Sequence, residues 1–100
     1  MLASDDIISF IEENKDVLKT YGVKKIALFG SYARGDATPD SDVDLLVEFE
    51  KGRGLFRDYT NLLNFLEDKL QKPVDLVKPH LLREELKPHV LGEIKYEARV

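Results

Sequence analysis

The sequence predicts an α/β fold in which helices pack on a small mixed β-sheet of about three strands. Two observations lead to this prediction. Short apolar runs typical of strands alternate with longer stretches in which apolar residues recur at helical spacing. In addition, 100 residues with 43% hydrophobic content are enough for one core and too few for a second domain. We therefore expect residues 1–100 to form a single domain.

Charge and composition exclude several classes of protein. Charged residues make up 34% of the chain and no apolar run approaches membrane-spanning length, which excludes a membrane protein. The net charge of −4 opposes extended binding to the phosphate backbone of nucleic acids. Cysteine is absent, so disulfides, zinc–thiolate sites and cysteine nucleophiles are excluded. The acidic segment Ser4-Asp5-Asp6 is unlike a signal peptide, and we expect a cytoplasmic protein.

The first third of the chain is predicted to form a helix followed by a strand. Ser4 is a suitable N-cap, and apolar residues at helical spacing predict a helix from about residue 5 to 20 that ends at Tyr21-Gly22. Residues 23–29 are typical of a strand buried on at least one face, and Gly30-Ser31 interrupts it.

The middle of the chain continues the alternation. A short helix is predicted from Ser31 to Arg34, and the polar segment 36–41 that follows contains a proline, which prevents its continuation. Residues 42–49 form the second predicted strand. The apolar stripe over residues 55–70 predicts a helix of about sixteen residues whose leucines pack on the sheet.

The last third is predicted to contain one strand and two helical fragments. Residues 74–77 form the third strand, and the fragments span 81–86 and 90–98, separated by Lys87-Pro88. A helical crossover joins the second and third strands, which predicts that they are parallel. The connection between the first two strands is much shorter and allows an antiparallel pair.

Acidic residues at the second and third strands suggest a metal site. Asp42 and Asp44 are two positions apart, so a strand presents their carboxylates on one face. Such close like charges repel unless a cation lies between them, and oxygen ligands without histidine or cysteine suit Mg²⁺ or Mn²⁺. Asp75 is the third candidate ligand, because an aspartate among apolar strand residues costs free energy unless it is paired or metal-bound.

The turn after the first strand provides features of a phosphate site. Gly30 allows close approach of the backbone, and Ser31 adds a hydroxyl and N–H groups at the start of a helix. Arg34, one turn later, could contact a phosphate or pair with Asp36 or Asp40. Together with the carboxylates, these parts meet the needs of nucleotidyl transfer from a metal-bound triphosphate.

The same residues carry a resemblance to a known family. Gly30-Ser31, ten intervening residues and Asp42-Val43-Asp44 match the signature of the DNA polymerase β-like nucleotidyltransferase superfamily, and Asp75 resembles its separate third carboxylate. The runs Gly-Ser-Tyr-Ala-Arg-Gly and Ser-Asp-Val-Asp-Leu-Leu-Val are most similar to those of the minimal nucleotidyltransferases (MNT). The resemblance implies a polymerase β-like nucleotidyltransferase fold.

The resemblance also implies an activity and a partner. Minimal nucleotidyltransferases act as antitoxins that transfer AMP from ATP to a tyrosine of a HEPN-domain ribonuclease toxin, with which a hetero-oligomer is expected. By matching position, Gly30 and Ser31, with Arg34 nearby, would hold the triphosphate, and Asp42 and Asp44 would bind Mg²⁺. Asp75 would ligate metal on the acceptor side and help to deprotonate the acceptor hydroxyl.

Two alternatives fit parts of the same pattern. The chain could neutralise its partner by binding alone, with a vestigial nucleotide site. It could instead transfer nucleotides to RNA ends or small molecules, although the negative charge and the single-domain length count against that acceptor. Within the sequence, nothing identifies the acceptor.

Overall fold

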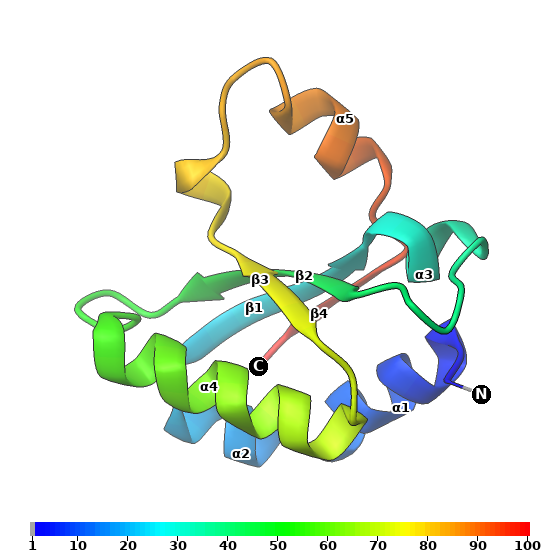
Figure 1. Ribbon diagram of the computed structural model, residues 1–100. Helices are drawn as coiled ribbons and strands as arrows, with labels where there is room; N and C mark the ends of the chain where they lie inside the picture. The colour runs from blue at the N-terminus through cyan, green and yellow to red at the C-terminus, as the bar shows by residue number, and fades with distance from the viewer. Residues whose placement is uncertain (1) are drawn as a thin grey trace.

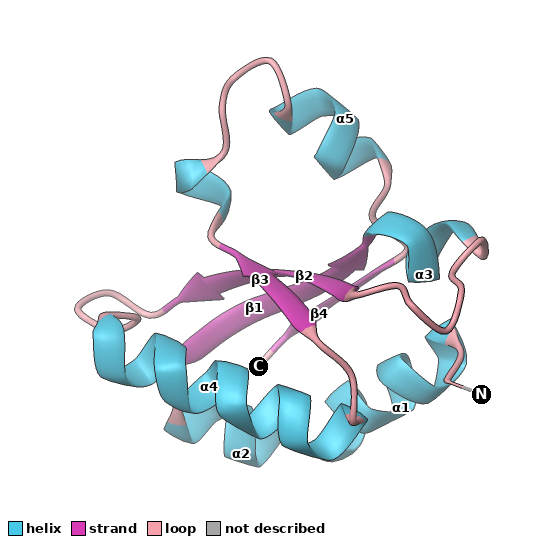
Figure 2. Ribbon diagram, in the orientation of Figure 1, coloured by secondary structure: helices cyan, strands magenta, loops and turns pink. Residues whose placement is uncertain are grey.

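Residues 2–100, the part of the chain that the computed structural model describes, form a four-stranded mixed sheet with helices on both faces (Figures 1 and 2). The elements in chain order are α1 (Ser4–Glu13), α2 (Lys15–Thr20), β1 (Val23–Phe29), α3 (Gly30–Arg34), β2 (Val43–Phe49), α4 (Phe56–Leu70), β3 (Val74–Val77), the 3₁₀ turn η1 (Pro79–Leu81), α5 (Lys87–Gly92) and β4 (Tyr96–Arg99). The predicted α/β class is confirmed.

The sheet has the strand order β3-β2-β1-β4. β2 runs antiparallel to β1 and parallel to β3, as the lengths of their connections predict. The register aligns Phe29 with Asp44 across the first pair and Asp44 with Asp75 across the second. The register therefore brings the end of β1 and two of the predicted site residues to one end of the sheet.

The C-terminal segment differs from its prediction. The helix expected over 90–98 is right only for its first residues, which belong to α5, because Tyr96–Arg99 form β4, which pairs antiparallel with β1 and adds a fourth strand. The fragment expected over 81–86 is wrong, since only the 3₁₀ turn η1 reaches into it. Pro88 lies in the first turn of α5 instead of separating two helices, a position where its missing N–H is not needed. Pairing with β1 places Ala98 opposite Ile26 and buries it, so a long-range contact overrides the local pattern.

The N-terminal helix also departs from its prediction. It is divided at Asn14, whose side-chain amide donates a hydrogen bond to the carbonyl of Phe10 at 2.8 Å. The N-cap is Ala3 instead of Ser4, because the Asp6 carboxylate accepts the Ala3 N–H at 2.8 Å and Ser4 is already helical. The boundary moves by one residue and the buried face is unchanged.

The core lies mainly on one face of the sheet. α1, α2 and α4 cover this face, as Figure 1 shows, and bury large side chains that include Ile7, Ile11, Leu18, Leu28, Leu45, Leu62 and Leu66. The other face has a smaller cluster of Ala27, Phe29 and Leu46, which is covered by residues from η1 to Ile94. Leu55, the first residue of the predicted stripe, is not part of the core, because it precedes α4 and is 76% exposed.

Within residues 2–100, none of the helices combines the length and the apolar character needed to cross a lipid bilayer.

Candidate active site

The turn from β1 into α3 brings the backbone against Asp44. Gly30 has φ +77°, and a Cβ placed there would lie 2.1 Å from Oδ2 of Asp44. Both the left-handed backbone and the lack of a side chain are therefore required at this position. Phe29, the register partner of Asp44, precedes this turn, which fixes Gly30-Ser31 beside the carboxylate.

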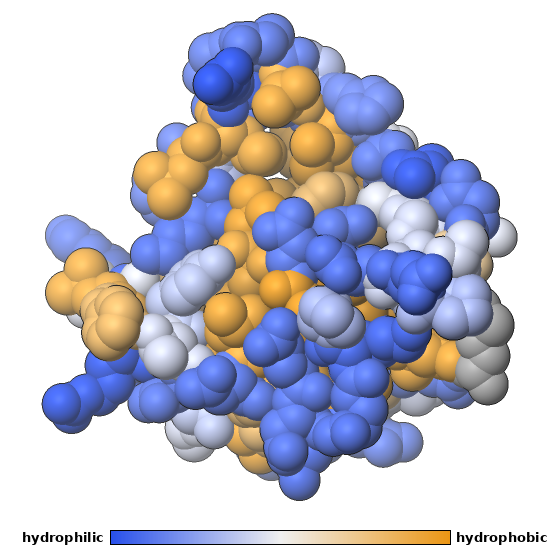
Figure 3. All heavy atoms as spheres, viewed as in Figure 1, coloured by the Kyte–Doolittle hydropathy of each residue, from blue (hydrophilic) through white to orange (hydrophobic). Residues whose placement is uncertain are grey.

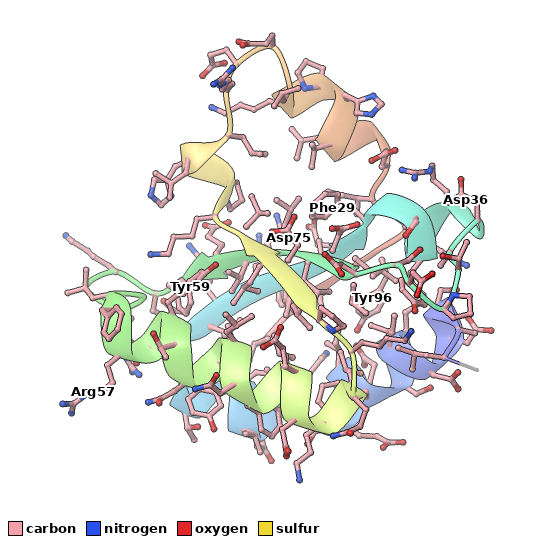
Figure 4. The ribbon with its side chains drawn as sticks, viewed as in Figure 1. Phe29, Asp36, Arg57, Tyr59, Asp75 and Tyr96 are labelled. Atoms are coloured by element: carbon pink, nitrogen blue, oxygen red, sulfur yellow. The ribbon has the colours of Figure 1, made fainter. Side chains whose placement is uncertain are left out.

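Asp44 and Asp75 lie on neighbouring strands in parallel register, so their side chains share one face of the sheet. Figure 4 shows Asp75 on the face that is turned towards α5. Asp42 precedes β2 by one residue and is exposed, as is Asp75, whereas Asp44 is partly buried. The structure therefore brings the three predicted carboxylates to one end of the face that is less completely covered.

The electrostatics of Asp44 reflect this proximity. Partial burial, followed by the charges of Asp75 and Asp42, raises the pKa of Asp44 to about 6. The positive charge of Arg34 and a hydrogen bond from the Ser31 backbone N–H act in the opposite direction. The Asp44 carboxylate thus has two negative neighbours, Asp42 and Asp75, and two groups that stabilise its charge, Arg34 and the Ser31 N–H.

Arg34 is held by acidic residues. Its Nε lies 3.2 Å from Oδ2 of Asp36, and its Nη1 donates to a carboxylate oxygen of Glu93, whose side chain is only 16% exposed. The predicted alternative of pairing with Asp36 is confirmed, and Asp40 instead uses its backbone N–H to contact Thr38. Contact of Arg34 with a phosphate remains a prediction.

Glu93 is a residue that sequence reasoning missed. It lies 59 positions after Arg34, at the end of α5, and no local pattern indicates that the two should meet. The contact joins α3 to the C-terminal segment that covers the second face of the sheet. In this structure the guanidinium of Arg34 is therefore held by Glu93 as well as by Asp36.

The carboxylates provide suitable donors for a hard cation. In the described residues 2–100, no three acidic or histidine side chains are already arranged as a metal site. Asp42, Asp44 and Asp75 nevertheless offer only oxygen donors. Burial, followed by the charges of Asp75 and Asp42, raises the pKa of Asp44, and a cation would relieve the charge repulsion. Such a donor set suits Mg²⁺ or Mn²⁺ better than zinc.

Comparisons with known proteins agree with this geometry. A family model described as a nucleotidyltransferase domain matches residues 7–100. The protein adenylyltransferase MntA of Thermococcus cleftensis is 40% identical over 97 residues, which cover 96% of this chain and 97% of that protein.

Solved structures give the same result. A protein described as a minimal nucleotidyltransferase superposes with a TM-score of 0.79 at 36% identity, covering 93% of this chain and 94% of the other. A crystal structure of a toxin–antitoxin with AMP-PNP superposes with a TM-score of 0.65 at 26% identity, covering 94% of this chain and 71% of the other.

Proposed function

The chain belongs to the nucleotidyltransferase domain family, and on that premise we propose that it transfers AMP from ATP to a hydroxyl of a partner protein. The observation that carries the proposal is the register that places Asp44 beside Asp75, with Gly30-Ser31 against Asp44. One surface thus has a turn suited to phosphate, two carboxylates suited to a cation and a further carboxylate on a neighbouring strand.

The nucleotide side of the reaction uses the turn and the β2 carboxylates. We assign the triphosphate to the turn at Gly30-Ser31, because this turn opens α3 and the lack of a side chain at Gly30 lets its backbone lie directly against the Asp44 carboxylate. Asp42 and Asp44 would hold Mg²⁺. When bound, that cation neutralises phosphate charge and favours ionisation of the acceptor hydroxyl.

The acceptor side of the reaction uses Asp75. Its exposed carboxylate accepts the proton of the incoming hydroxyl, whose oxygen then forms a bond with the α-phosphorus of ATP. The bond from that phosphorus to the bridging oxygen breaks, and pyrophosphate leaves. The product carries AMP on the acceptor oxygen.

The acceptor that we propose is a tyrosine of a HEPN-domain ribonuclease toxin, which makes this chain an antitoxin. Support comes from the relative named protein adenylyltransferase MntA and from the similar toxin–antitoxin structure with AMP-PNP. The net charge of −4 also favours a protein acceptor over a long nucleic acid.

The test is transfer to the protein encoded by the adjacent gene. The two proteins are mixed with ATP and Mg²⁺, and the acceptor is weighed by mass spectrometry. Asp44→Asn should lower the rate of AMP addition by about 10²–10³-fold, a loss typical of a missing electrostatic group. The control Asp40→Asn changes an exposed acid in the same loop and should retain the rate of the unmodified protein.

Two results would contradict the proposal. If Asp44→Asn silenced the ribonuclease as well as the unmodified chain does, neutralisation would be by binding alone. If tRNA or an aminoglycoside gained AMP while the protein did not, the acceptor class would be wrong.

A further inference from the structure

An exposed apolar groove lies next to the acceptor side of the proposed active site. The groove has a volume of about 390 Å³ and is formed by the start of α4, the end of β3 and η1. Its lining residues are Leu55, Phe56, Tyr59, Leu76, Val77, Lys78 and Leu81. We call this surface the β3 groove.

Large side chains at the rim of the β3 groove are left in water. Leu55, Phe56 and Leu81 are 76%, 85% and 70% exposed, respectively. Figure 3 shows apolar atoms protruding over the start of α4 and over η1 on the same side of the molecule. Adjacent exposed hydrophobic side chains of this size are typical of a surface that contacts another protein.

The floor of the β3 groove is firmly held. The Tyr59 hydroxyl donates to the carbonyl of Leu76 at 2.6 Å. The ammonium group of Lys78 lies 5.4 Å from the centre of the Tyr59 ring and donates to the carbonyl of Gly54. The groove is therefore bounded by fixed groups and would need little rearrangement to accept a ligand.

The β3 groove begins at the residue that follows Asp75. Leu76 and Val77 directly follow Asp75 on β3, which is an edge strand of the sheet. The Tyr59 hydroxyl is hydrogen-bonded to the carbonyl of Leu76, the residue directly after Asp75, so this part of the groove lies near the carboxylate. Burial, followed by the charge of Asp75, raises the pKa of Tyr59. A segment lying in the groove would pass beside Asp75.

The charge around the β3 groove is opposite to that of the whole chain. Lys78 is the one charged residue that lines the groove. The flanking segments 51–58 and 76–83 contain five basic residues and one acidic residue, with the carboxylate of Asp75 just before the second segment, whereas the chain carries a net charge of −4. The acidic residue, Asp58, is already paired with Arg53 at 2.8 Å. Arg57 projects into solvent at the start of α4 (Figure 4). This surface suits a partner with negative charge.

We propose that the β3 groove docks the acceptor protein through a segment that combines apolar and acidic side chains, and so guides its hydroxyl to Asp75. This inference rests on the proposed function for the identity of the occupant. The apolar side chains would cover Phe56 and Leu81, and the acidic ones would face Arg57 and its basic neighbours.

The binding test uses synthetic peptides without nucleotide. One peptide has a tyrosine between leucines with flanking glutamates, and its twin has lysines in place of the glutamates. In ¹⁵N-resolved NMR titrations, the acidic peptide should shift the amides of residues 55–59, 76–78, 80 and 81, and its twin should bind at least about 10-fold more weakly. Equal binding of the two peptides, or shifts elsewhere, would overturn the proposal.

Matched variants separate docking from general effects. Phe56→Ser and Leu81→Ser should each weaken the acidic peptide about 10-fold, since each removes an apolar contact at the groove. Leu86→Ser is the control, because it removes an exposed leucine that does not line the groove. Arg57→Glu should weaken binding, and Lys69→Glu, an exposed change at the far end of α4, should not.

Two further measurements test whether a second copy of the chain occupies the groove and whether the docked peptide receives AMP. If sedimentation shows a dimer that Phe56→Ser converts to a monomer, the groove is an interface between copies and the proposal is wrong. AMP transfer to the acidic peptide is then measured with ATP and Mg²⁺. Binding at the groove without transfer to any acceptor would support docking while contradicting the proposed function, so the two failures are distinguishable.

Discussion

The two faces of the sheet differ in what covers them. α1, α2 and α4 bury one face almost completely, whereas the segment from η1 to Ile94 covers only part of the other. The carboxylates of Asp44 and Asp75 lie at the end of the second face. Because neighbouring strand residues point to opposite faces, Leu45 stabilises the fold from a position adjacent to a residue that we assign to chemistry.

The difference implies that stability and activity can be changed separately. The face that helices cover stabilises the fold by burying apolar area, and truncating one of its side chains leaves a cavity. On the other face, burial and the neighbouring charges of Asp75 and Asp42 raise the pKa of Asp44, so its ionised form works against folding in the absence of a cation. The following variants test whether the two faces are independent.

The largest effect on stability is expected at Leu45. Leu45→Ala should lower the free energy of unfolding by about 3–5 kcal/mol, because this fully buried side chain lies in the larger cluster. Leu46→Ala, the control on the opposite face, should cost about 2 kcal/mol, since its cluster is small and thinly covered. Urea unfolding measures both values, and equal losses would show that the two faces contribute alike.

The second effect concerns Gly30, at the turn from β1 into α3. Gly30→Ala should lower stability by about 1–3 kcal/mol and reduce AMP transfer strongly, because its Cβ would displace the Asp44 carboxylate. Gly35→Ala is the matched control: φ is +84° there, but its Cβ would meet open space. The control should lose about 1 kcal/mol and keep its transfer rate. Similar rates for the two variants would argue against a role for Asp44.

The third effect is a gain of stability. Asp44 has a pKa near 6 in the folded chain, above its ordinary value of 3.8, so its ionisation opposes folding as the pH rises through that interval. At pH 7.5 without metal, Asp44→Asn should therefore be more stable by about 1 kcal/mol, allowing for solvent screening. The gain should vanish below pH 4. Thermal unfolding against pH measures it, and a constant difference would contradict the assignment.

The smallest effect is expected at a carboxylate away from the site. Asp58 has its pKa lowered to about 2 by hydrogen bonds from Arg53 and from the Gly54 backbone. Its contribution is fully present above its ordinary pKa and is lost as the pH falls through about 2. Asp58→Asn should flatten this acid limb of the stability curve and leave transfer unchanged. If Asp44→Asn flattened the acid limb of the stability curve instead, then Asp44 and not Asp58 would be the carboxylate whose ionised form stabilises the folded chain.

Strongly patterned elements could be predicted from the sequence. β1 at residues 23–29 and β3 at residues 74–77 have the predicted bounds, and β2 begins one residue later than expected. Glycines flank the apolar run of β1 and a proline precedes that of β3, and these residues mark strand ends locally. β4 could not be predicted, because a four-residue segment becomes a strand here by pairing with β1, and such pairing is not encoded at short range.

The candidate site divides in the same way. By itself, the sequence determined the residue types and the spacing of Gly30, Ser31, Asp42 and Asp44, because a turn followed by a strand fixes which side chains share a face. Only the tertiary structure decided that Asp75 lies beside Asp44, that Glu93 holds Arg34 and that an apolar groove opens between α4, β3 and η1. Those contacts join segments that are distant in sequence, and their positions depend on how the whole sheet is assembled.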